Sequence, residues 1–255
     1  MWTQELESKA KEIINNNQSV IECEEFFDKQ LKNWEKFYKF NKTNFFKDRH
    51  YILSEFQELK QDTRDKITLL DIGCGVGNSF YPLIKRLPNL HVFAFDFSKR
   101  AVNMASTHEL YITNKHRISL LPLDIVEDTI PFEACDYGIL MFVLSAIAPE
   151  RHKDVIMKIK DKLNKGAVLY FRDYARFDMA QLRFAERQKN KVGDNLYMRK
   201  DKTLSYFFDK KEIEDLFISC GFEIVESNLI CRLIENRKDN KQMHRLWLQI
   251  KFKKT

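Results

Sequence analysis

Hydrophobic positions in the middle of the chain form short apolar runs separated by longer amphipathic stretches. From Ile67 onward, the runs have the length of buried strands, and the stretches between them repeat at helical spacing. The predicted strands are Ile67–Gly73, His91–Phe97, Ile118–Asp124, Tyr137–Val143 and Ala167–Tyr174. The predicted helices are Gly77–Leu87, Ser98–Tyr111 and Pro149–Leu163, with Asn164–Gly166 as the stop signal of the last one. This alternation predicts βαβ units, and hence a parallel sheet with helices on both faces.

The pattern changes after Tyr174. Positions 175–204 combine many charges with scattered aromatic residues, which predicts an irregular, basic insertion. A helix over Asp209–Cys220 follows, and then two apolar stretches, Phe222–Cys231 and Leu246–Phe252, which we expect to pair as antiparallel strands. We therefore expect a doubly wound, Rossmann-like α/β domain over residues 67–255, with a seven-stranded, mostly parallel sheet.

Residues 1–66 precede this alternation and predict an N-terminal helical extension. Thr3–Asn16 has the composition of a polar helix, and the amide-rich positions 15–19 end it because short amide side chains compete for backbone hydrogen bonds. Glu22–Phe40 places mostly aromatic residues close to helical spacing. We expect this second helix to pack along one aromatic face.

Composition narrows the class of protein. The 255 residues are 44% hydrophobic, which allows one substantial core, and 43 Lys+Arg against 37 Asp+Glu favour an acidic partner. The five cysteines are scattered without a C-x-x-C pair, which disfavours a zinc site and fits a reducing compartment, the cytoplasm or also the nucleus. No apolar run approaches the roughly 18 residues of a membrane span. We expect a monomer that binds no membrane, no DNA and no metal.

A glycine loop is the strongest local signal. The predicted strand that begins at Ile67 runs directly into Gly73, Gly75 and Gly77 and then into a helix, so backbone can approach a ligand at free helix N–H groups. Asn78 stands where a dinucleotide fingerprint needs Gly or Ala, and no Walker-type Gly-Lys-Ser/Thr is present, which disfavours NAD and phosphate-loop chemistry. The acidic-x-Gly-x-Gly-x-Gly form resembles the first motif of class I methyltransferases, which implies S-adenosylmethionine as cofactor and S-adenosylhomocysteine as product.

Two further carboxylates follow the next strands. Asp96 ends the second predicted strand, roughly 20 residues beyond the glycines, where a carboxylate accepts both hydroxyls of a ribose. Asp124 ends the third and is suited to accept a hydrogen bond from the adenine amino group. Either one alone is equally compatible with a helix cap or a solvent contact. Because the ends of parallel strands form a binding crevice, their shared placement favours a cofactor site.

Four stretches resemble the eukaryotic tRNA 3-methylcytidine methyltransferase family. They are Lys32–Tyr38 with Thr43–His50, then Gly73–Asn78, then Phe142–Ala146, and finally Phe171–Tyr174 with Ser205–Phe208. The resemblance spans nearly the whole chain beyond the first helix. It implies methylation of cytidine 32 in the anticodon loop of serine tRNAs, with threonine and arginine tRNAs as further candidates and seryl-tRNA synthetase as a candidate partner.

The same resemblance implies site residues. Contacts to S-adenosylmethionine are implied for Trp34, Tyr38, Gly73, Asp96, Asp124 and Met141. Residues 1–66 are expected to serve as a cofactor lid and RNA-binding segment. The chain departs from the family pattern at Ala175, where members often have Gly, and at Asp201–Leu204, where they have Asp-Gly-Thr-Arg. These departures affect the geometry of one loop and one substrate contact.

The chemistry of cytosine N3 points to one further carboxylate. This nitrogen is neutral with a free lone pair at pH 7, so attack on a sulfonium methyl needs alignment more than a general base. Methylation leaves a positive charge on the base, and a carboxylate near its amine stabilises the transition state. Asp173, at the end of the fifth predicted strand, is the catalytic candidate, and Arg172 is the next. The alternative is a structural salt bridge of Asp173 with Arg172 or Arg176.

Two basic stretches predict RNA contacts. Arg172–Lys202 has nine Lys and Arg against five Asp and Glu, and Lys32–His50 adds six cations. The substrate-binding candidates are Lys47, Arg49, His50, Arg183, Phe184, Tyr197 and Arg199. His50 is equally suited to cap a backbone group, and each stretch alone is compatible with a solvated face. Two other functions stay open: a methyltransferase for another RNA or a small metabolite, and a non-catalytic cofactor-binding adaptor that holds tRNA.

Overall fold

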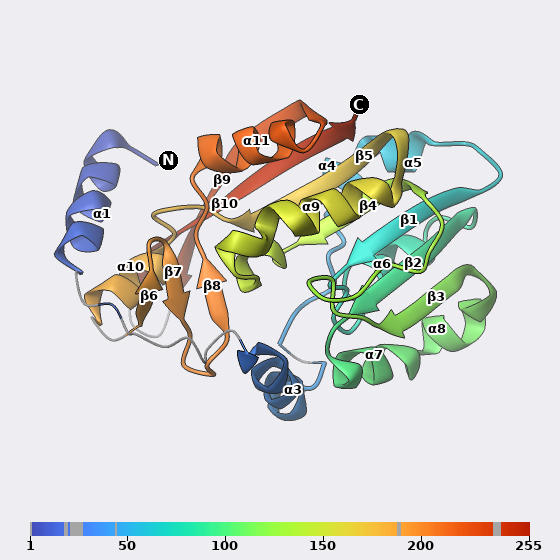
Figure 1. The fold of residues 1–255 in the computed structure, drawn as a ribbon, viewed down its shortest axis with the longest axis horizontal. Helices are drawn as coiled ribbons and strands as arrows, with labels where there is room; N and C mark the ends of the chain where they lie inside the picture. Colours follow the sequence, from blue (N-terminus) through green and yellow to red (C-terminus); the bar gives the residue numbers. More distant parts are fainter. Residues whose placement is uncertain (1, 18–19, 21–27, 44, 188–189, 237–240) are drawn as a thin grey trace.

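The computed structural model of the chain describes residues 2–17, 20, 28–43, 45–187, 190–236 and 241–255. A seven-stranded sheet runs through the molecule in the order β3-β2-β1-β4-β5-β10-β9 (Figure 1). Its strands are β1 (Ile67–Ile72), β2 (Leu90–Asp96), β3 (Ile118–Pro122), β4 (Cys135–Met141), β5 (Leu163–Tyr174), β9 (Phe222–Asn236) and β10 (Lys241–Lys254). The first five pair in parallel, and β10 pairs antiparallel with both β5 and β9. The predicted fold class and the predicted antiparallel pair are confirmed.

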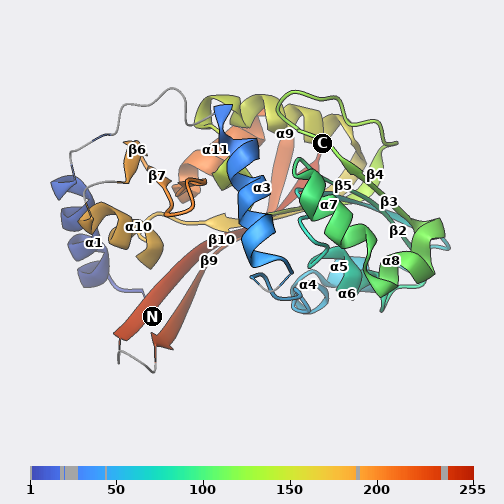
Figure 2. The same cartoon turned by 90° about the horizontal axis from the view of Figure 1, so that it is seen from below.

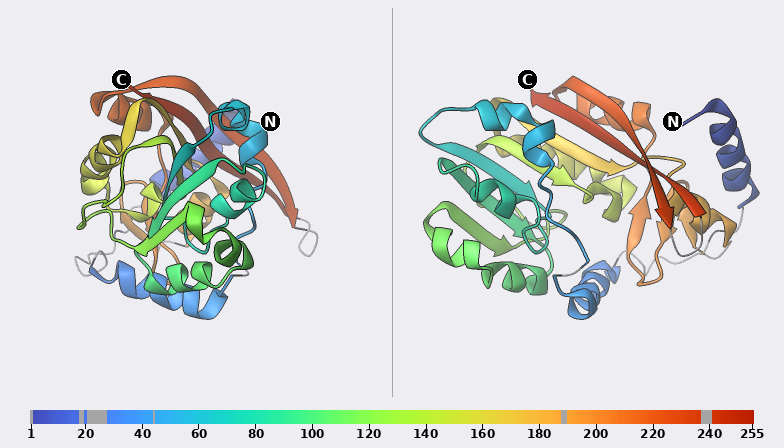
Figure 3. Two further views of the ribbon diagram at one scale, coloured as in Figure 1. Left: turned by 90° about the vertical axis from the view of Figure 1, so that its right-hand side faces the viewer. Right: turned by 180° about the vertical axis from the view of Figure 1, so that it is seen from behind.

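Helices cover both faces of this sheet, as the right-hand panel of Figure 3 shows. They are α4 (Ile52–Glu55), α5 (Gln57–Gln61), α6 (Phe80–Ile84), α7 (Lys99–Ser106), α8 (Glu109–Asn114), α9 (His152–Asp161) and α11 (Lys210–Ser219). Successive strand residues point to opposite faces, so alternate residues of β5 enter two different cores. Phe171 packs with α9 and α11, whereas Tyr170 packs with α4 and α5. Both cores are apolar, which accounts for the nearly unbroken hydrophobic runs of the parallel strands.

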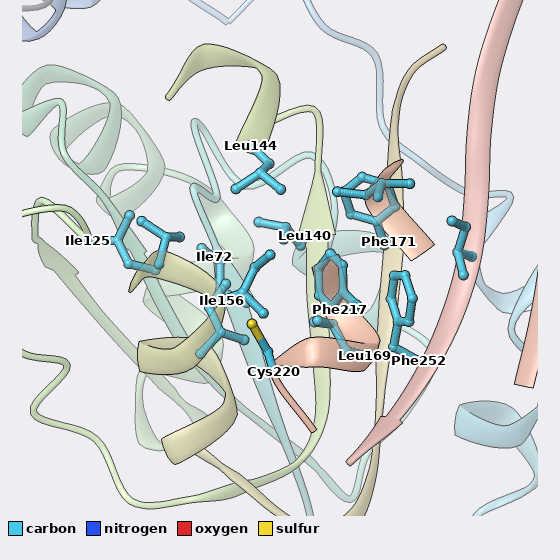
Figure 4. Close-up of a cluster of buried hydrophobic side chains, with 14 of the residues drawn as sticks. Ile72, Ile125, Leu140, Leu144, Ile156, Leu169, Phe171, Phe217, Cys220 and Phe252 are labelled. Carbon is cyan, nitrogen blue, oxygen red and sulfur yellow. The ribbon is translucent and has the colours of Figure 1, made fainter. Parts of the chain in front are cut away.

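The core beneath α9 and α11 is the larger one and is shown in Figure 4. Leu140, Leu169 and Phe171 project from the strands toward Ile156 of α9 and Phe217 of α11. The ring of Phe217 stacks on Phe252 at 3.9 Å between centroids and 10° between planes. This packing ties the antiparallel strand β10 to the parallel part of the sheet.

Several predicted boundaries differ from the structure. The predicted helix Ser98–Tyr111 is divided into α7 and α8, because His108 adopts an extended backbone and its ring nitrogen accepts the Leu110 N–H as a cap. The predicted Gly77–Leu87 helix is shortened to α6. Asn164–Gly166, expected to stop a helix, instead belong to the first part of β5, with Gly166 at φ 81°. The predicted helix Glu22–Phe40 is observed as α3 (Gln30–Asn41), and its residues 22–27 lie outside the described part.

The basic insertion is folded, which corrects the expectation of an irregular segment. It contains α10 (Met179–Glu186) and a three-stranded antiparallel sheet of β6 (Lys191–Gly193), β7 (Leu196–Met198) and β8 (Leu204–Tyr206). Asn195 at φ 57° and Lys202 at φ 71° make the tight turns between these short strands. Such turns and three-residue strands leave too little periodicity for recognition from sequence. The N-terminal helix α1 (Gln4–Asn16) packs against α10 (Figure 1).

A buried carboxylate joins the insertion to the main sheet. Asp178 is fully buried, caps α10 by accepting the Ala180 N–H at 2.8 Å, and accepts the Leu246 N–H of β10 at 2.8 Å. It also forms an ion pair with Arg245 at 2.9 Å. The Asp178 carboxylate therefore pairs with a backbone N–H at the start of α10, a backbone N–H of β10 and the charge of Arg245.

We expect Asp178→Ala to lower the free energy of unfolding by about 2–4 kcal/mol, because a cap is lost and buried donors are left unpaired. Asp209→Ala is the matched control: Asp209 also caps a helix, α11, but its side chain is 46% exposed. Its removal should cost about 1 kcal/mol. Urea unfolding of both variants measures the difference, and equal losses would contradict the anchoring role of Asp178.

Candidate functional site

The carboxyl ends of β1, β2 and β4 open into a pocket of about 700 Å³. Eight residues predicted to bind cofactor or substrate line it: Trp34, Tyr38, Arg49, Gly73, Gly75, Asp96, Asp124 and Met141. Helix α3 lies close to the amino end of α7, as Figure 2 shows from below. The pocket thus combines the ends of parallel strands with a segment from the N-terminal extension.

Asp96 is held by the backbone of the glycine loop. One carboxylate oxygen accepts the Gly75 N–H at 2.9 Å, and the other accepts the Ser98 N–H at 2.9 Å. Burial raises the pKa of Asp96 to about 6, although both N–H bonds lower it. Each oxygen retains acceptor capacity, so this carboxylate is suited to receive two neighbouring hydroxyls. Asp124 is held similarly, with one oxygen accepting the Val126 N–H at 2.9 Å.

The glycines of the loop serve two different contacts. Gly75 has φ 57°, and a Cβ there would lie 2.8 Å from the Tyr38 hydroxyl, so its absence allows α3 to approach the loop. Gly77 has φ 95°, and a Cβ there would lie 2.1 Å from the ring of Tyr81. Gly77 does not line the pocket. Its predicted cofactor contact is therefore replaced by a packing role beneath α6.

Helix α3 is fastened on two sides, to the main domain and to the insertion. Near the main domain, Glu35 accepts hydrogen bonds from the Ser98 hydroxyl at 2.9 Å and the Arg100 N–H at 3.1 Å. Toward the insertion, Asn33 donates to the Lys202 carbonyl at 2.9 Å. The sequence pattern did not single out Glu35, because an acidic residue among lysines has the signature of a solvated helix face.

Two buried polar atoms, one on pocket-lining Trp34 and one on Asp71 two residues before Gly73, lack partners among the described residues. The Trp34 indole N–H is buried without an acceptor, and one oxygen of Asp71 is buried without a donor. Arg49 donates to the Ser79 hydroxyl at 2.5 Å, and its charge lowers the pKa of Asp71, which burial raises to about 7. Buried groups of this kind are normally satisfied, so they indicate a polar ligand.

These groups match the parts of S-adenosylmethionine. Asp96 offers acceptors for a ribose diol, and Asp124 an acceptor near an adenine edge. Met141 supplies an apolar wall. Arg49 and the Trp34 N–H, which both line the pocket, are donors suited to a carboxylate. The donor set and the volume of the pocket therefore fit the cofactor that the glycine loop predicts.

Asp173 lies at the end of β5 beside the pocket. It is fully buried and accepts the N–H groups of Ser145 at 3.0 Å and Tyr174 at 2.8 Å. Burial raises its pKa to about 6, whereas these bonds and the charge of Arg199 lower it. The alternative salt bridge with Arg172 or Arg176 is not formed, since those side chains pair with Glu55 and Asp209.

Planar groups gather next to Asp173 and against two residues that line the pocket, Trp34 and Phe142. The Arg199 guanidinium lies 5.6 Å from the Tyr174 ring centre and 5.8 Å from that of Trp34. Phe142, whose ring centre is 5.1 Å from that of Tyr174, lines the pocket with φ 60°. A positive φ at a bulky residue is strained and is typical of functional sites. Phe142 and Tyr174 lie within the motifs of the family resemblance but were not predicted as site residues.

Arg172 faces away from the pocket, which corrects its candidacy as a catalytic residue. As the neighbour of Asp173 in β5, it points to the opposite face of the sheet. Its guanidinium is 3% exposed, pairs with Glu55 and Gln249, and lies 4.3 Å from the Tyr51 ring centre. Arg172 therefore fastens α4 of the N-terminal extension to β5 and β10.

The predicted RNA contacts are divided between surface and core. Lys47, His50 and Arg183 are exposed. Tyr197 is fully buried, with its ring stacked 6.0 Å from that of Phe184 and perpendicular to Phe207 at 5.8 Å. This burial argues against a base-stacking role for Tyr197, whose ring instead fills the core of the insertion.

Within the described part of the chain, no group of three His, Cys, Asp or Glu side chains is placed to hold a metal ion. No helix among those residues is long and apolar enough to cross a membrane.

The charge of Asp71 should cost stability at high pH. The pKa of Asp71 is raised in the folded state. Protonation of Asp71 therefore favours folding fully when the pH is below the ordinary pKa of an aspartate, and this contribution to the free energy of unfolding is lost as pH rises through about 7. We expect Asp71→Asn to stabilise the cofactor-free protein by about 1–4 kcal/mol at pH 8 and to have little effect at pH 4.

Asp136→Asn is the control of opposite sign. Burial raises the pKa of Asp136, but hydrogen bonds from Thr68 and Arg64 outweigh burial and leave it below its ordinary value. Its removal should destabilise the protein at pH 8. Denaturant unfolding at the two pH values measures both effects. If Asp71→Asn is not more stable than wild type at pH 8, the claim that a buried Asp71 charge opposes folding is wrong.

Comparisons with known proteins agree with this geometry. A family model described as a methyltransferase domain matches residues 45–227. The tRNA N(3)-cytidine methyltransferase METTL6 of Mus musculus is 38% identical over 259 residues, covering 98% of this chain and 90% of that protein. The tRNA N(3)-methylcytidine methyltransferase trm141 of Schizosaccharomyces pombe is 38% identical over 238 residues, covering 91% of this chain and 95% of that protein.

A solved structure supports the fold. The 1,6-didemethyltoxoflavin-N1-methyltransferase of Burkholderia thailandensis, with S-adenosylhomocysteine bound, matches with a TM-score of 0.62 at 15% identity, covering 92% of each chain. This likeness shows the class I methyltransferase fold. The two relatives are each 38% identical to this chain over more than nine tenths of its length. The chain therefore belongs to the tRNA N(3)-cytidine methyltransferases.

Proposed function

We propose that this protein transfers the methyl group of S-adenosylmethionine to N3 of a cytidine in tRNA. The observation that carries the proposal is a cofactor-sized pocket lined by Ala146, whose neighbour Ser145 donates its N–H to the buried carboxylate of Asp173. When bound, S-adenosylmethionine supplies an electrophilic methyl group on a positively charged sulfur. The family relationship supports tRNA as the substrate.

The residues of the pocket bind and orient the donor. Asp96 receives the ribose hydroxyls and Asp124 the adenine amine, while Arg49 and the Trp34 N–H hold the carboxylate of the methionine part. Helix α3 covers this arrangement from the side of the extension and excludes water. Exclusion of water strengthens each of these electrostatic contacts.

The target base has to leave its stack before it reacts. N3 lies on the Watson–Crick edge, so the cytidine must be unpaired or extruded. Tyr174 and Arg199 present planar groups beside Asp173, and we assign them to hold the base. Phe142, whose ring centre is 5.1 Å from that of Tyr174, lines the same pocket and limits the space open to the base.

Asp173 stabilises the charge that develops on the base. Its pKa of about 6 leaves it mainly ionised at pH 7, with both oxygens positioned by backbone N–H groups. A carboxylate that accepts from the exocyclic amine gains strength as positive charge spreads over the ring, so it favours the transition state over the ground state. No separate general base is required.

The finer assignment follows the family. We propose cytidine 32 of the anticodon loop of serine tRNAs as the target, with threonine and arginine tRNAs as further candidates and seryl-tRNA synthetase as a helper. An anticodon loop suits the site because its bases are already unpaired. We place the activity in the cytoplasm or also in the nucleus, where tRNA is found.

Nucleoside mass spectrometry tests the reaction. Incubation of tRNA lacking 3-methylcytidine with the protein and isotope-labelled S-adenosylmethionine should give labelled 3-methylcytidine, and fragment analysis should place it at position 32. Label in another nucleoside would indicate a different RNA methyltransferase. Binding of tRNA without any label, with and without added seryl-tRNA synthetase, would favour the non-catalytic adaptor.

Asp173→Asn should separate binding from chemistry. We expect roughly a 10²-fold loss in the single-turnover rate with unchanged affinity for cofactor and tRNA, the scale for removal of one preorganised electrostatic partner. The wild-type rate should fall as pH drops below about 6, where Asp173 becomes protonated. The variant should lack that decline.

Asp178→Asn is the matched control, because both aspartates are fully buried and accept backbone N–H groups. It should lower stability while leaving the single-turnover rate nearly unchanged. If Asp173→Asn behaves in the same way, Asp173 is structural and the catalytic assignment is wrong.

A further inference from the structure

A row of aromatic rings leads from the cofactor pocket to the protein surface. Trp34 lies 5.1 Å from Phe37, and Phe37 lies 4.8 Å from Phe45, measured between ring centres. Phe45 is also 4.8 Å from Phe46. Trp34 and Phe46 line the pocket, and Phe37 is buried. Phe45 is therefore the outer end of a continuous aromatic cluster that begins at the methyl-donor site.

The orientation of Phe45 is fixed by its neighbours. Its ring is inclined by 79° to Phe37 and by 81° to Phe46, so both contacts are edge-to-face. Such pairs contribute beyond simple burial. At the same time, 56% of Phe45 is exposed. A large apolar ring that is held rigidly and yet left in water is preorganised to stack against a flat partner.

The charges around this ring favour a polyanion. Lys36, Lys39, Lys42 and Lys47 are exposed on α3 and the segment after it. Within the described residues, none of these four lysines forms an ion pair. Cations without acidic partners beside an exposed aromatic ring are the combination by which proteins bind single-stranded nucleic acid.

We propose that Phe45 is a stacking platform for an unpaired base adjacent to the target nucleotide, an inference that rests on the proposed function. Extrusion of the target base removes one stacking partner from each neighbouring base. A rigid ring beside the pocket entrance replaces that partner and holds the loop open while the target occupies the site. Because every base has a flat face, this contact secures the RNA without reading its sequence.

Substitution of Phe45 tests stacking directly. In RNA-binding titrations with a serine tRNA transcript, Phe45→Ala should weaken affinity roughly 10-fold or more, Phe45→Trp should retain it, and Phe45→Leu should lose most of it. The salt dependence of binding should not change, since no phosphate contact is lost. Cofactor affinity and thermal stability of the variants show whether the pocket and fold are intact.

Phe40→Ala is the matched control. Phe40 is 78% exposed on α3, shortly before Phe45 in the sequence, and no ring of the described residues stacks on it. Its removal should change RNA affinity less than twofold. If both alanine variants weaken binding equally, or if Phe45→Leu binds as well as wild type, Phe45 makes only a general apolar contact. The proposed stacking role is then wrong.

Abasic RNAs identify the partner base. Two transcripts, each lacking the base on one side of the target cytidine, are compared with the intact transcript. The effect of Phe45→Ala should disappear with one of them, because the ring then has nothing to stack on. An undiminished effect with both overturns the platform. A wild-type protein that methylates tRNA while Phe45→Ala binds it normally refutes this inference alone, whereas absence of methylation refutes the proposed function.

Discussion

Burial of carboxylates near the carboxyl ends of β1, β2 and β5 is the constraint on which the rest of the structure depends. Asp71, Asp96 and Asp173 are each almost fully buried, and burial raises the pKa of all three. Charges in such a position oppose folding, so other parts of the molecule must supply the stability. Two apolar cores, one on each face of the sheet, provide it.

Hydrogen bonds from backbone N–H groups lower the free-energy cost of burying these carboxylates. Asp96 and Asp173 each accept two of them, which fixes the carboxylates without neutralising them by an ion pair. Asp71 has one oxygen without a partner and depends on the nearby charge of Arg49. The arrangement therefore keeps acceptors directed at a ligand, at a cost in stability that is typical of functional sites.

The N-terminal extension completes the site through contacts that lie far apart in sequence. Glu35 ties α3 to α7, Asn33 ties it to the insertion, and Arg172 ties the following helix α4 to β5. As a result, Trp34 and Arg49 are placed over the ends of the parallel strands. The extension and the sheet thus form one pocket, and Arg199 of the insertion lies over the ring of pocket-lining Trp34.

Local patterns in the sequence determined the main elements and the cofactor residues. Apolar runs defined the parallel strands, and Asp96 and Asp124 could be placed because strand ends of a parallel sheet share one edge. Only the tertiary structure decided the rest. Arg172 and Asp173 are adjacent and both polar, yet alternation along β5 sends one behind the sheet and the other beside the pocket. Tyr197 was predicted to contact RNA, but its ring is buried, whereas Phe45, to which the sequence pattern assigned no role, is exposed. Burial depends on which distant segments meet, and that information is not contained in local periodicity.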